Sequence, residues 1–197
     1  MSYNITPIFR NPGRPRDGSI DDRVIKATLN LIVEIGYDAM SMANIAAEAK
    51  VTKPSLYRRW ENKEDLVTSA VSTLAAKGPD HLADGVWEQL ECELKSFHKA
   101  ISRPGGMALI GNVLALEARH PQLVKLYREK VVNVRRSRLI RVLESGKASG
   151  ALRPETDARS VVSMLLGFYY ASRLEGTQHD ETWPATCIKL IRRGIET

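Results

Sequence analysis

Apolar residues recur at intervals of three and four positions along almost the whole chain, and this spacing constrains the fold more than any other feature. Between positions 20 and 35, for example, Val24, Ala27 and Leu31 share one face of a helix. Few segments alternate in the manner of a β-strand. We therefore predict an all-α protein of about nine helices, at about 20–35, 42–49, from 52 onward, 63–77, 83–102, 107–119, 122–148, 155–175 and 183–195.

Capping and turn-forming residues mark the ends of the first helices. Gly36 follows the last apolar position of the first helix, where a glycine suits a C-terminal cap. Ser41 and Thr52 are good N-caps for the two short helices that follow. Pro54 falls in the first turn of the second of these, where its missing N–H leaves no hydrogen bond unmade. These signals predict two short helices joined by a tight turn.

Size and composition exclude several classes of protein. A chain of 197 residues with 43% hydrophobic residues can bury a real core, as one domain or as a small domain joined to a larger one. Residues 1–16 lack the apolar region of a signal peptide, and the apolar run at 161–171 is too short to span a bilayer. Cys92 and Cys187 match no metal or redox spacing. We expect a cytoplasmic protein without a membrane partner, metal or cofactor.

The segment KVTKPSLYRRWENKEDL, residues 50–66, combines clustered cations with two aromatic rings. Between positions 50 and 63 there are five Lys or Arg residues and only one acidic residue, Glu61. A surface that serves only solubility intersperses positive and negative charges. Leu56 and Trp60, four positions apart, give the second short helix an inward face. The other side chains are then available to enter a DNA major groove or to contact phosphates: Lys53, Ser55, Tyr57, Arg58 and Arg59, followed by Lys63.

An extended basic arm precedes the first helix. In NPGRPR, residues 11–16, each proline pushes the preceding residue into an extended conformation. Arg14 and Arg16 could then lie in an A·T-rich minor groove, where negative potential is concentrated. The alternative is an ordinary charged tail. A neighbouring pair of DNA-binding helices favours the arm.

The segment GYDAMSMANIAAEAKVTKPSLYRRWENKEDL, residues 36–66, resembles the N-terminal domain of the tetracycline-repressor (TetR) family of bacterial transcriptional regulators. The match is ungapped over about thirty residues and includes the Leu56-Tyr57 pair and the aromatic Trp60. By that resemblance, Thr52 would cap the recognition helix, and the residues that would touch DNA are Ser41, Lys53, Ser55, Tyr57, Arg59 and Lys63. The family usually has glycine where this chain has Lys50, and a left-handed lysine costs roughly 1 kcal/mol. Either the turn is wound differently here or a phosphate contact of Lys50 offsets that cost.

The resemblance implies a homodimer on a near-palindromic operator, with a C-terminal domain that binds a small molecule and then releases the DNA. We predict an arm at 1–19, a helix-turn-helix domain at 20–79 with its turn motif at about 43–62, and an effector-binding and dimerisation domain at 80–197. Dimer candidates from the apolar stripes of the last two helices are Val161, Leu165, Tyr169, Ile188, Ile191 and Ile195. Candidate walls of the ligand pocket are Trp87, Phe97, Met107, Leu109, Val113, Leu116, Tyr127, Met164 and Phe168. For both groups of residues, the alternative is that they pack in the core of a single chain.

Other functions have weaker support in the sequence. SFHK, residues 96–99, has the Ser-x-x-Lys form of a serine acyl-enzyme, but the partner motifs of that chemistry are missing. The run RRSRLIR, residues 135–141, is either a second nucleic-acid patch or a solvated helix face. The main prediction is a repressor that a small molecule releases from its operator, and not an enzyme. The alternatives are a regulator that activates or needs no ligand, and a helical enzyme that binds a small molecule.

Overall fold

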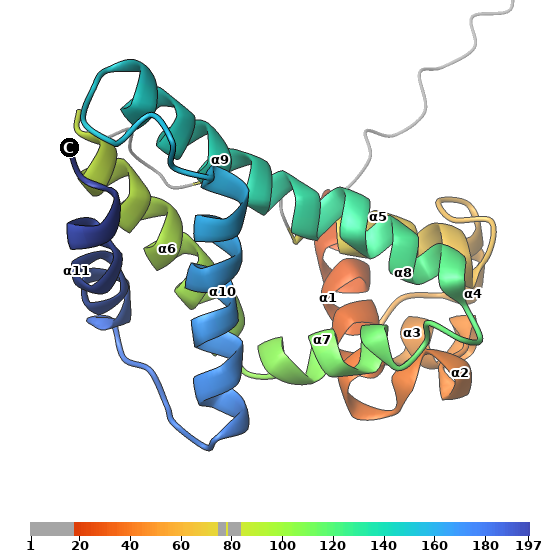
Figure 1. The fold of residues 1–197 in the computed structure, drawn as a ribbon. Coiled ribbons are helices and arrows are strands. Elements are labelled where there is room, and N and C mark those ends of the chain that lie inside the picture. The colour runs from red at the N-terminus through yellow and green to blue at the C-terminus, as the bar shows by residue number, and fades with distance from the viewer. Residues whose placement is uncertain (1–17, 75–77, 79–83) are drawn as a thin grey trace, which may run out of the picture.

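The computed structural model describes residues 18–74, 78 and 84–197, and these residues form helices joined by turns (Figure 1). The all-α prediction is therefore confirmed. No described helix is both long and apolar enough to cross a bilayer. The helices are α1 (Gly18–Glu34), α2 (Gly36–Ala39), α3 (Met42–Glu48), α4 (Lys53–Tyr57), α5 (Lys63–Thr73), α6 (Val86–Ser102), α7 (Gly106–Leu114), α8 (Pro121–Tyr127), the π-helical η1 (Arg128–Val132), α9 (Asn133–Ala148), α10 (Ala158–Leu174) and α11 (Trp183–Ile195).

Most observed helices lie within a few residues of the predicted ranges, with two differences. Helix α2 is an additional short turn of helix that begins at Gly36, whose φ of 78° still breaks the chain after α1. Helix α7 ends at Leu114 rather than near 119. The predicted end of the 63–77 helix and the predicted domain boundary at 79–80 lie outside the described residues.

The first hydrophobic core joins the N-terminal helices to three later segments. Val24, Ile45, Leu56 and Leu66, from α1, α3, α4 and α5, are completely buried in it. Residues of α7, α8 and η1 complete the same core, and α5 packs directly against α8. The short helices α3 and α4 are therefore held by a core that the C-terminal half of the chain helps to build.

The predicted helix at 122–148 is one rod with a π-helical segment inside it. Figure 1 shows α8 and α9 running along the length of the molecule. Tyr127 and Val131 face the first core, whereas Leu139 and Leu143 face the second. A π-helical turn adds a residue to the local repeat and so rotates the buried stripe. This rotation explains why Val134, three positions after the buried Val131, is 39% exposed.

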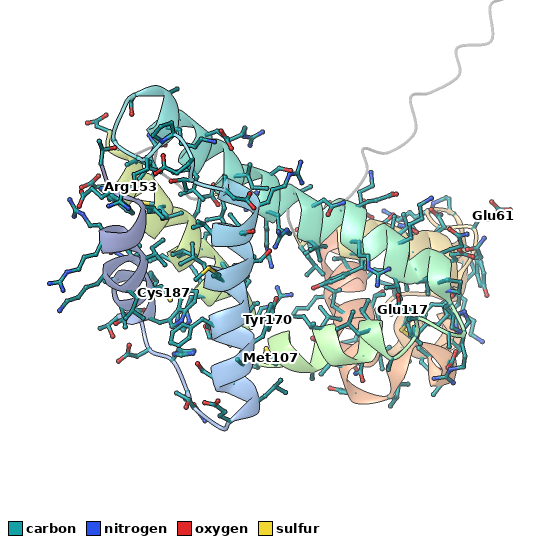
Figure 2. All side chains as sticks on the ribbon, in the orientation of Figure 1. Glu61, Met107, Glu117, Arg153, Tyr170 and Cys187 are labelled. Atoms are coloured by element: carbon teal, nitrogen blue, oxygen red, sulfur yellow. The ribbon has the colours of Figure 1, made fainter. Side chains whose placement is uncertain are left out.

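The second hydrophobic core lies between α6, α9, α10 and α11, at the other end of the molecule. Figure 2 shows this separation, because Cys187 of the second core lies far from Glu61, which follows α4. Leu90, Leu94 and Leu143 are completely buried here. Phe97 and Tyr169 pack edge to face, with 5.2 Å between ring centroids. Burial of such rings contributes strongly to stability.

Four of the predicted dimer contacts belong instead to this second core. These residues are only 1–8% exposed in the single chain, so most of their surface packs inside one molecule: Val161, Leu165, Tyr169 and Ile188. Ile191 and Ile195 are half-buried against the same core. Because α10 is apolar nearly all round, its sequence does not distinguish the inward stripe from the outward one.

We predict opposite stability changes for two glycine substitutions in helices. In Gly146→Ala, the new Cβ would lie 2.7 Å from Val86 Cγ2 and 2.9 Å from Leu152 Cδ1. Overpacking of this kind costs about 1–3 kcal/mol, which exceeds the gain of up to about 1 kcal/mol from removing a helical glycine. In Gly111→Ala, no atom of the described residues lies within 4 Å of the new Cβ. The stability gain from removing a helical glycine should therefore not be reduced by overpacking.

Thermal unfolding of the two variants and the wild type tests this pair. The melting temperature should fall for Gly146→Ala and rise for Gly111→Ala. A Gly146→Ala protein that melts above the wild type would contradict the close packing of α9 on Val86 and Leu152.

Candidate functional site

The short helices α3 and α4 both begin with the predicted side-chain caps. Ser41 Oγ accepts a hydrogen bond from the backbone N–H of Asn44 at 3.2 Å, and Asn44 Oδ1 accepts from the N–H of Ser41 at 3.1 Å. Thr52 Oγ1 accepts from the N–H of Ser55 at 3.4 Å. These bonds satisfy N–H groups that no helical carbonyl can reach. The caps therefore fix where each helix of the pair begins.

The turn between α3 and α4 is left-handed at Lys50. The φ of Lys50 is 53°, and the N–H groups of Lys50 and Val51 donate to the carbonyls of Ala47 and Ala46 at 3.1 and 2.9 Å. Of the two interpretations of Lys50, the differently wound turn is therefore wrong. The side chain of Lys50 is exposed beside the start of α4. Lysine thus adopts here a conformation that favours glycine, at a cost of roughly 1 kcal/mol.

Helix α4 has a buried side and an exposed side. Leu56 is completely buried and Trp60, just after the helix, is 7% exposed, as their spacing predicts. Lys53 and Arg58 are exposed, and Tyr57 is 53% exposed although it is a large aromatic residue. Ser41, Lys50 and Thr52 are also exposed, around the start of the helix. The exposed side therefore carries cations, hydroxyl groups and one aromatic ring, which are groups that bind phosphates and base edges.

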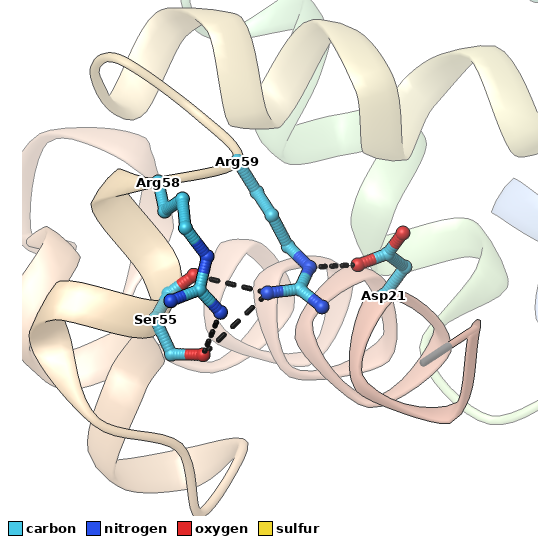
Figure 3. A network of polar contacts seen from close by, with 4 residues as sticks. All are labelled: Asp21, Ser55, Arg58 and Arg59. Carbon is cyan, nitrogen blue, oxygen red and sulfur yellow. Dashed lines mark hydrogen bonds and ion pairs between the residues drawn. The ribbon is translucent and has the colours of Figure 1, made fainter. Parts of the chain in front are cut away.

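Arg59 lies against the protein rather than in solvent (Figure 3). Its Nε is 2.6 Å from Asp21 Oδ1 in α1, and its Nη1 donates to the carbonyl of Ser55 at 3.3 Å. The side chain of Arg59 is only 12% exposed. This corrects the prediction that Arg59 contacts DNA. The guanidinium is used to attach the end of α4 to α1.

Lys63 also has a role within the fold. Its Nζ donates to the carbonyls of Tyr37 and Met40 at 2.9 and 3.0 Å and lies 4.1 Å from the centroid of the Tyr37 ring. An ammonium group near the last carbonyls of α2 is a favourable C-terminal contact. The prediction of Lys63 as a freely available phosphate donor is therefore corrected. Arg14 and Arg16 of the predicted arm lie outside the described residues.

The basic run at 135–141 mostly connects helices. Arg135 donates to the carbonyl of Leu74 at 2.8 Å, and burial is the main cause that lowers its pKa. Arg136 donates to Ser163 Oγ at 2.9 Å, and Arg138 pairs with the buried Glu93 at 3.0 Å. These contacts argue against a second nucleic-acid patch, because arginines that are bonded to the protein are poorly placed to contact phosphates.

The predicted pocket residues do not surround a single cavity. Leu109, Val113, Leu116 and Tyr127 belong to the first core, and Phe97 and Met107 to the second. Trp87 stacks under Arg192, 5.1 Å from its ring centroid. Met164 and Phe168 are 64% and 41% exposed, so the prediction that they line an internal pocket is wrong. Only two of the set line a described hollow: Leu109 and Met107.

Two hollows meet at the loop between α6 and α7. One, of about 470 Å³, lies against α1 and includes Val33, Arg103 and Leu109. The other, of about 280 Å³, lies against the end of α10 and includes Arg103, Tyr169 and Arg173. Sequence reasoning missed Asp21, Arg103 and Arg173. The Pro-Gly-Gly sequence that follows Arg103 is the one local signal that could have drawn attention to this loop.

Comparisons with known proteins agree with this arrangement. Residues 24–70 match the family model described as "Bacterial regulatory proteins, tetR family", and residues 83–191 match "Tetracyclin repressor-like, C-terminal domain". The HTH-type transcriptional regulator AqdR of Rhodococcus erythropolis is 31% identical over 182 residues, which cover 91% of this chain and 86% of that protein.

Solved structures with the same fold include two regulators named FadR. The fatty acid degradation regulator FadR from Bacillus halodurans is 23% identical, with a TM-score of 0.74 over 91% of this chain and 97% of that one. FadR from Bacillus subtilis, solved in complex with stearoyl-CoA, is 19% identical, with a TM-score of 0.68 over 89% of this chain and 99% of that one. The two family models, the second of which alone spans more than half of the chain, and the identity with AqdR show that this protein belongs to the TetR family of bacterial transcriptional regulators.

Proposed function

We propose that this regulator is a homodimeric repressor that reads a near-palindromic operator with α4 and leaves it when a small molecule binds the C-terminal helices. The exposed cationic side of α4 is the observation that carries the proposal. Lys53 and Arg58 project from a helix whose opposite side holds the buried Leu56. We assign the DNA contacts to Ser41, Lys50, Lys53, Tyr57 and Arg58, with Thr52 and Ser55 fixing the start of the helix.

A dimer supplies the second recognition helix that a palindromic operator requires. A two-fold axis can place two such helices in major grooves about 34–36 Å apart, or a multiple of this distance. An outward stripe of α10 is suited to the contact, because apolar side chains there remain in solvent in the single chain. Met164, Phe168 and Leu174 are 64%, 41% and 85% exposed, and Leu190 of α11 is 66% exposed. Exposed apolar residues in such numbers mark an interaction surface.

Release by a small molecule is supported by the relatives and by the shared first core. The Bacillus subtilis FadR structure, similar in fold, is a complex with stearoyl-CoA. In this chain, α5 leads from the DNA-reading helices and packs against α8. A ligand that changes the packing of the C-terminal helices would therefore tilt α5 and α4 together. A differential affinity of about 1–3 kcal/mol between the two arrangements is enough for regulation.

Lys53→Glu should abolish specific DNA binding and leave the dimer intact. The test uses the duplex that the purified protein selects from a random pool, and fluorescence anisotropy measures the affinity.

Lys53→Ala should lower the slope of log K against log salt by about 0.9 for each phosphate that the protein no longer neutralises, and so by about 1.8 in a dimer. Lys99→Ala, which removes a lysine from the exposed side of α6, should leave the slope unchanged. Wild-type affinity in Lys53→Glu would remove α4 from the DNA interface.

Asp21→Asn should reduce discrimination between the selected duplex and a scrambled one. The substitution frees Arg59, so α4 loses its attachment to α1 and gains a mobile cation. Binding to scrambled DNA should rise while specific binding falls. Stability should change by no more than about 1 kcal/mol, because Asp21 is 37% exposed. Asp22→Asn makes the same change in net charge at a neighbouring position. Equal loss of discrimination in both variants would show that only net charge matters.

Phe168→Glu should convert the dimer to a monomer, since it places a charge in the middle of the outward stripe of α10. Light scattering after size exclusion should give twice the 22.0 kDa of one chain for the wild type and a single chain's mass for the variant. Arg141→Glu, an exposed change on α9, should remain dimeric. A dimeric Phe168→Glu protein would place the dimer contact elsewhere.

A further inference from the structure

The smaller of the two hollows has the composition of a binding site for an anion. It lies between the α6–α7 loop, the end of α10 and the segment before α11, and its volume is about 280 Å³. Arg103 and Arg173 both line it, with His179 and Gln178, and none of the described residues that line it is acidic. Met107 and Tyr169 add apolar surface on the remaining sides (Figure 2 labels Met107 at the start of α7). Two cations without a carboxylate in a concave site favour an anionic guest.

Two residues that line this hollow also carry buried polar atoms without partners among the described residues. Arg173 Nε and His179 Nε2 are buried, and no described residue forms a hydrogen bond with either atom. Arg173 Nη1 donates to the carbonyl of Thr177 at 3.4 Å, so the guanidinium is held in place. Buried donors and acceptors are nearly always paired in native proteins. The orphaned atoms therefore indicate hydrogen bonds that a guest would complete.

Aromatic rings form a rigid wall behind these atoms. Tyr169 packs 4.9 Å from His179 and 4.8 Å from Trp183, measured between ring centroids. His98 stacks on Trp183 at 6.3 Å, and the ring nitrogens His98 Nδ1 and Trp183 Nε1 are likewise buried without partners among the described residues. Such a wall suits a flat or short apolar body attached to the anion.

The charges around His179 disfavour a further positive charge. Burial is the main cause that lowers the pKa of His179, and the charges of His98 and Arg173 lower it further, while Asp180 acts in the opposite direction. A bound anion would relieve the repulsion between these groups.

We propose that this hollow binds the effector through its anionic group, a carboxylate or phosphate on a small apolar body, with Arg173 and Arg103 as the donors. This inference rests on the proposed ligand-responsive function and deepens it by naming the class of effector and two residues that select it. The guanidinium groups would hold the anion from two sides, since one arginine lies on α10 and the other on the α6–α7 loop. Tyr169 and Met107 would contact the apolar body.

The α6–α7 loop connects the proposed anion site to the helices that we propose bind DNA. Arg103 and Gly105 line both hollows, the larger one against α1 and the smaller one against α10. Gly105 has a φ of 76°, and a Cβ built on it would lie 3.1 Å from Val33 Cγ1 of α1. Asn112 of α7 donates to the carbonyl of Ile32 at 2.8 Å. A movement of Arg103 toward an anion would therefore change the contact of this loop with α1, which carries the Asp21 that anchors Arg59.

Calorimetric titration of the full-length protein with three probes tests the inference. The probes are benzoate, phenyl phosphate and the neutral benzamide, which share one apolar body. We expect at least one anion to bind about tenfold or more tightly than benzamide, because charge-assisted hydrogen bonds are stronger than neutral ones. Arg173→Gln and Arg103→Gln should each reduce that affinity about tenfold or more. Arg141→Gln, an exposed loss of the same charge on α9, should leave it unchanged.

Three results would overturn the inference: equal affinity for benzamide and both anions, no measurable binding of either anion, or an affinity that Arg173→Gln and Arg103→Gln leave at the wild-type value. Thermal unfolding and binding to the selected duplex show that each variant is folded. Because the probes are titrated without DNA, a negative result would leave the DNA-binding function standing, whereas failure to bind any duplex would remove that function and not the pocket.

Discussion

Helix α4, which we propose reads DNA, has only five residues, so its conformation depends on contacts outside itself. A helix of this length has almost no stability in water, because nucleation is costly and few hydrogen bonds follow it. In this protein the conformation of α4 is set by the Thr52 cap at one end, by the completely buried Leu56 in the middle, and by the ion pair of Arg59 with Asp21 at the other end. These contacts leave Lys53 and Tyr57 exposed. A surface that is held in this way would meet DNA with little further ordering, which would lower the entropic cost of binding.

The arrangement of the two cores explains how distant helices can influence α4. The first core contains residues of α7, α8 and η1 as well as the N-terminal helices, so the two halves of the chain share one packed interior. The rod formed by α8, η1 and α9 then continues into the second core. Packed interiors respond to a displacement by switching between discrete arrangements rather than by gradual deformation. A ligand bound near α10, as we propose, would therefore be connected to α1 and α5 through packed side chains.

Local features of this protein were predictable from its sequence. The caps Ser41 and Thr52 and the inward pair Leu56 and Trp60 depend on neighbours within four positions, and all four lie as predicted. The helix-turn-helix segment is also specific enough to identify the family. Contacts between distant segments were not predictable in the same way. Arg59 and Asp21 are 38 positions apart, and nothing near either residue marks the other as its partner.

The orientation of α10 was also not predictable, because its inward Leu165 and its outward Phe168 have the same apolar character. The π-helical turn at 128–132 leaves no local signal, although it decides which stripe of the rod is buried. Both features depend on how whole helices pack against one another, which the periodicity of a single helix does not specify.

Photo-cross-linking from position 57 tests directly whether α4 is the element that enters the DNA groove. Tyr57 is replaced by p-benzoylphenylalanine, and the purified protein is irradiated with its selected duplex. Position 141, on the exposed side of α9, serves as the comparison. We expect efficient cross-linking to DNA from position 57 and none from position 141. Cross-linking from position 141 with none from position 57 would contradict the role of α4, because DNA would then lie on the C-terminal helices.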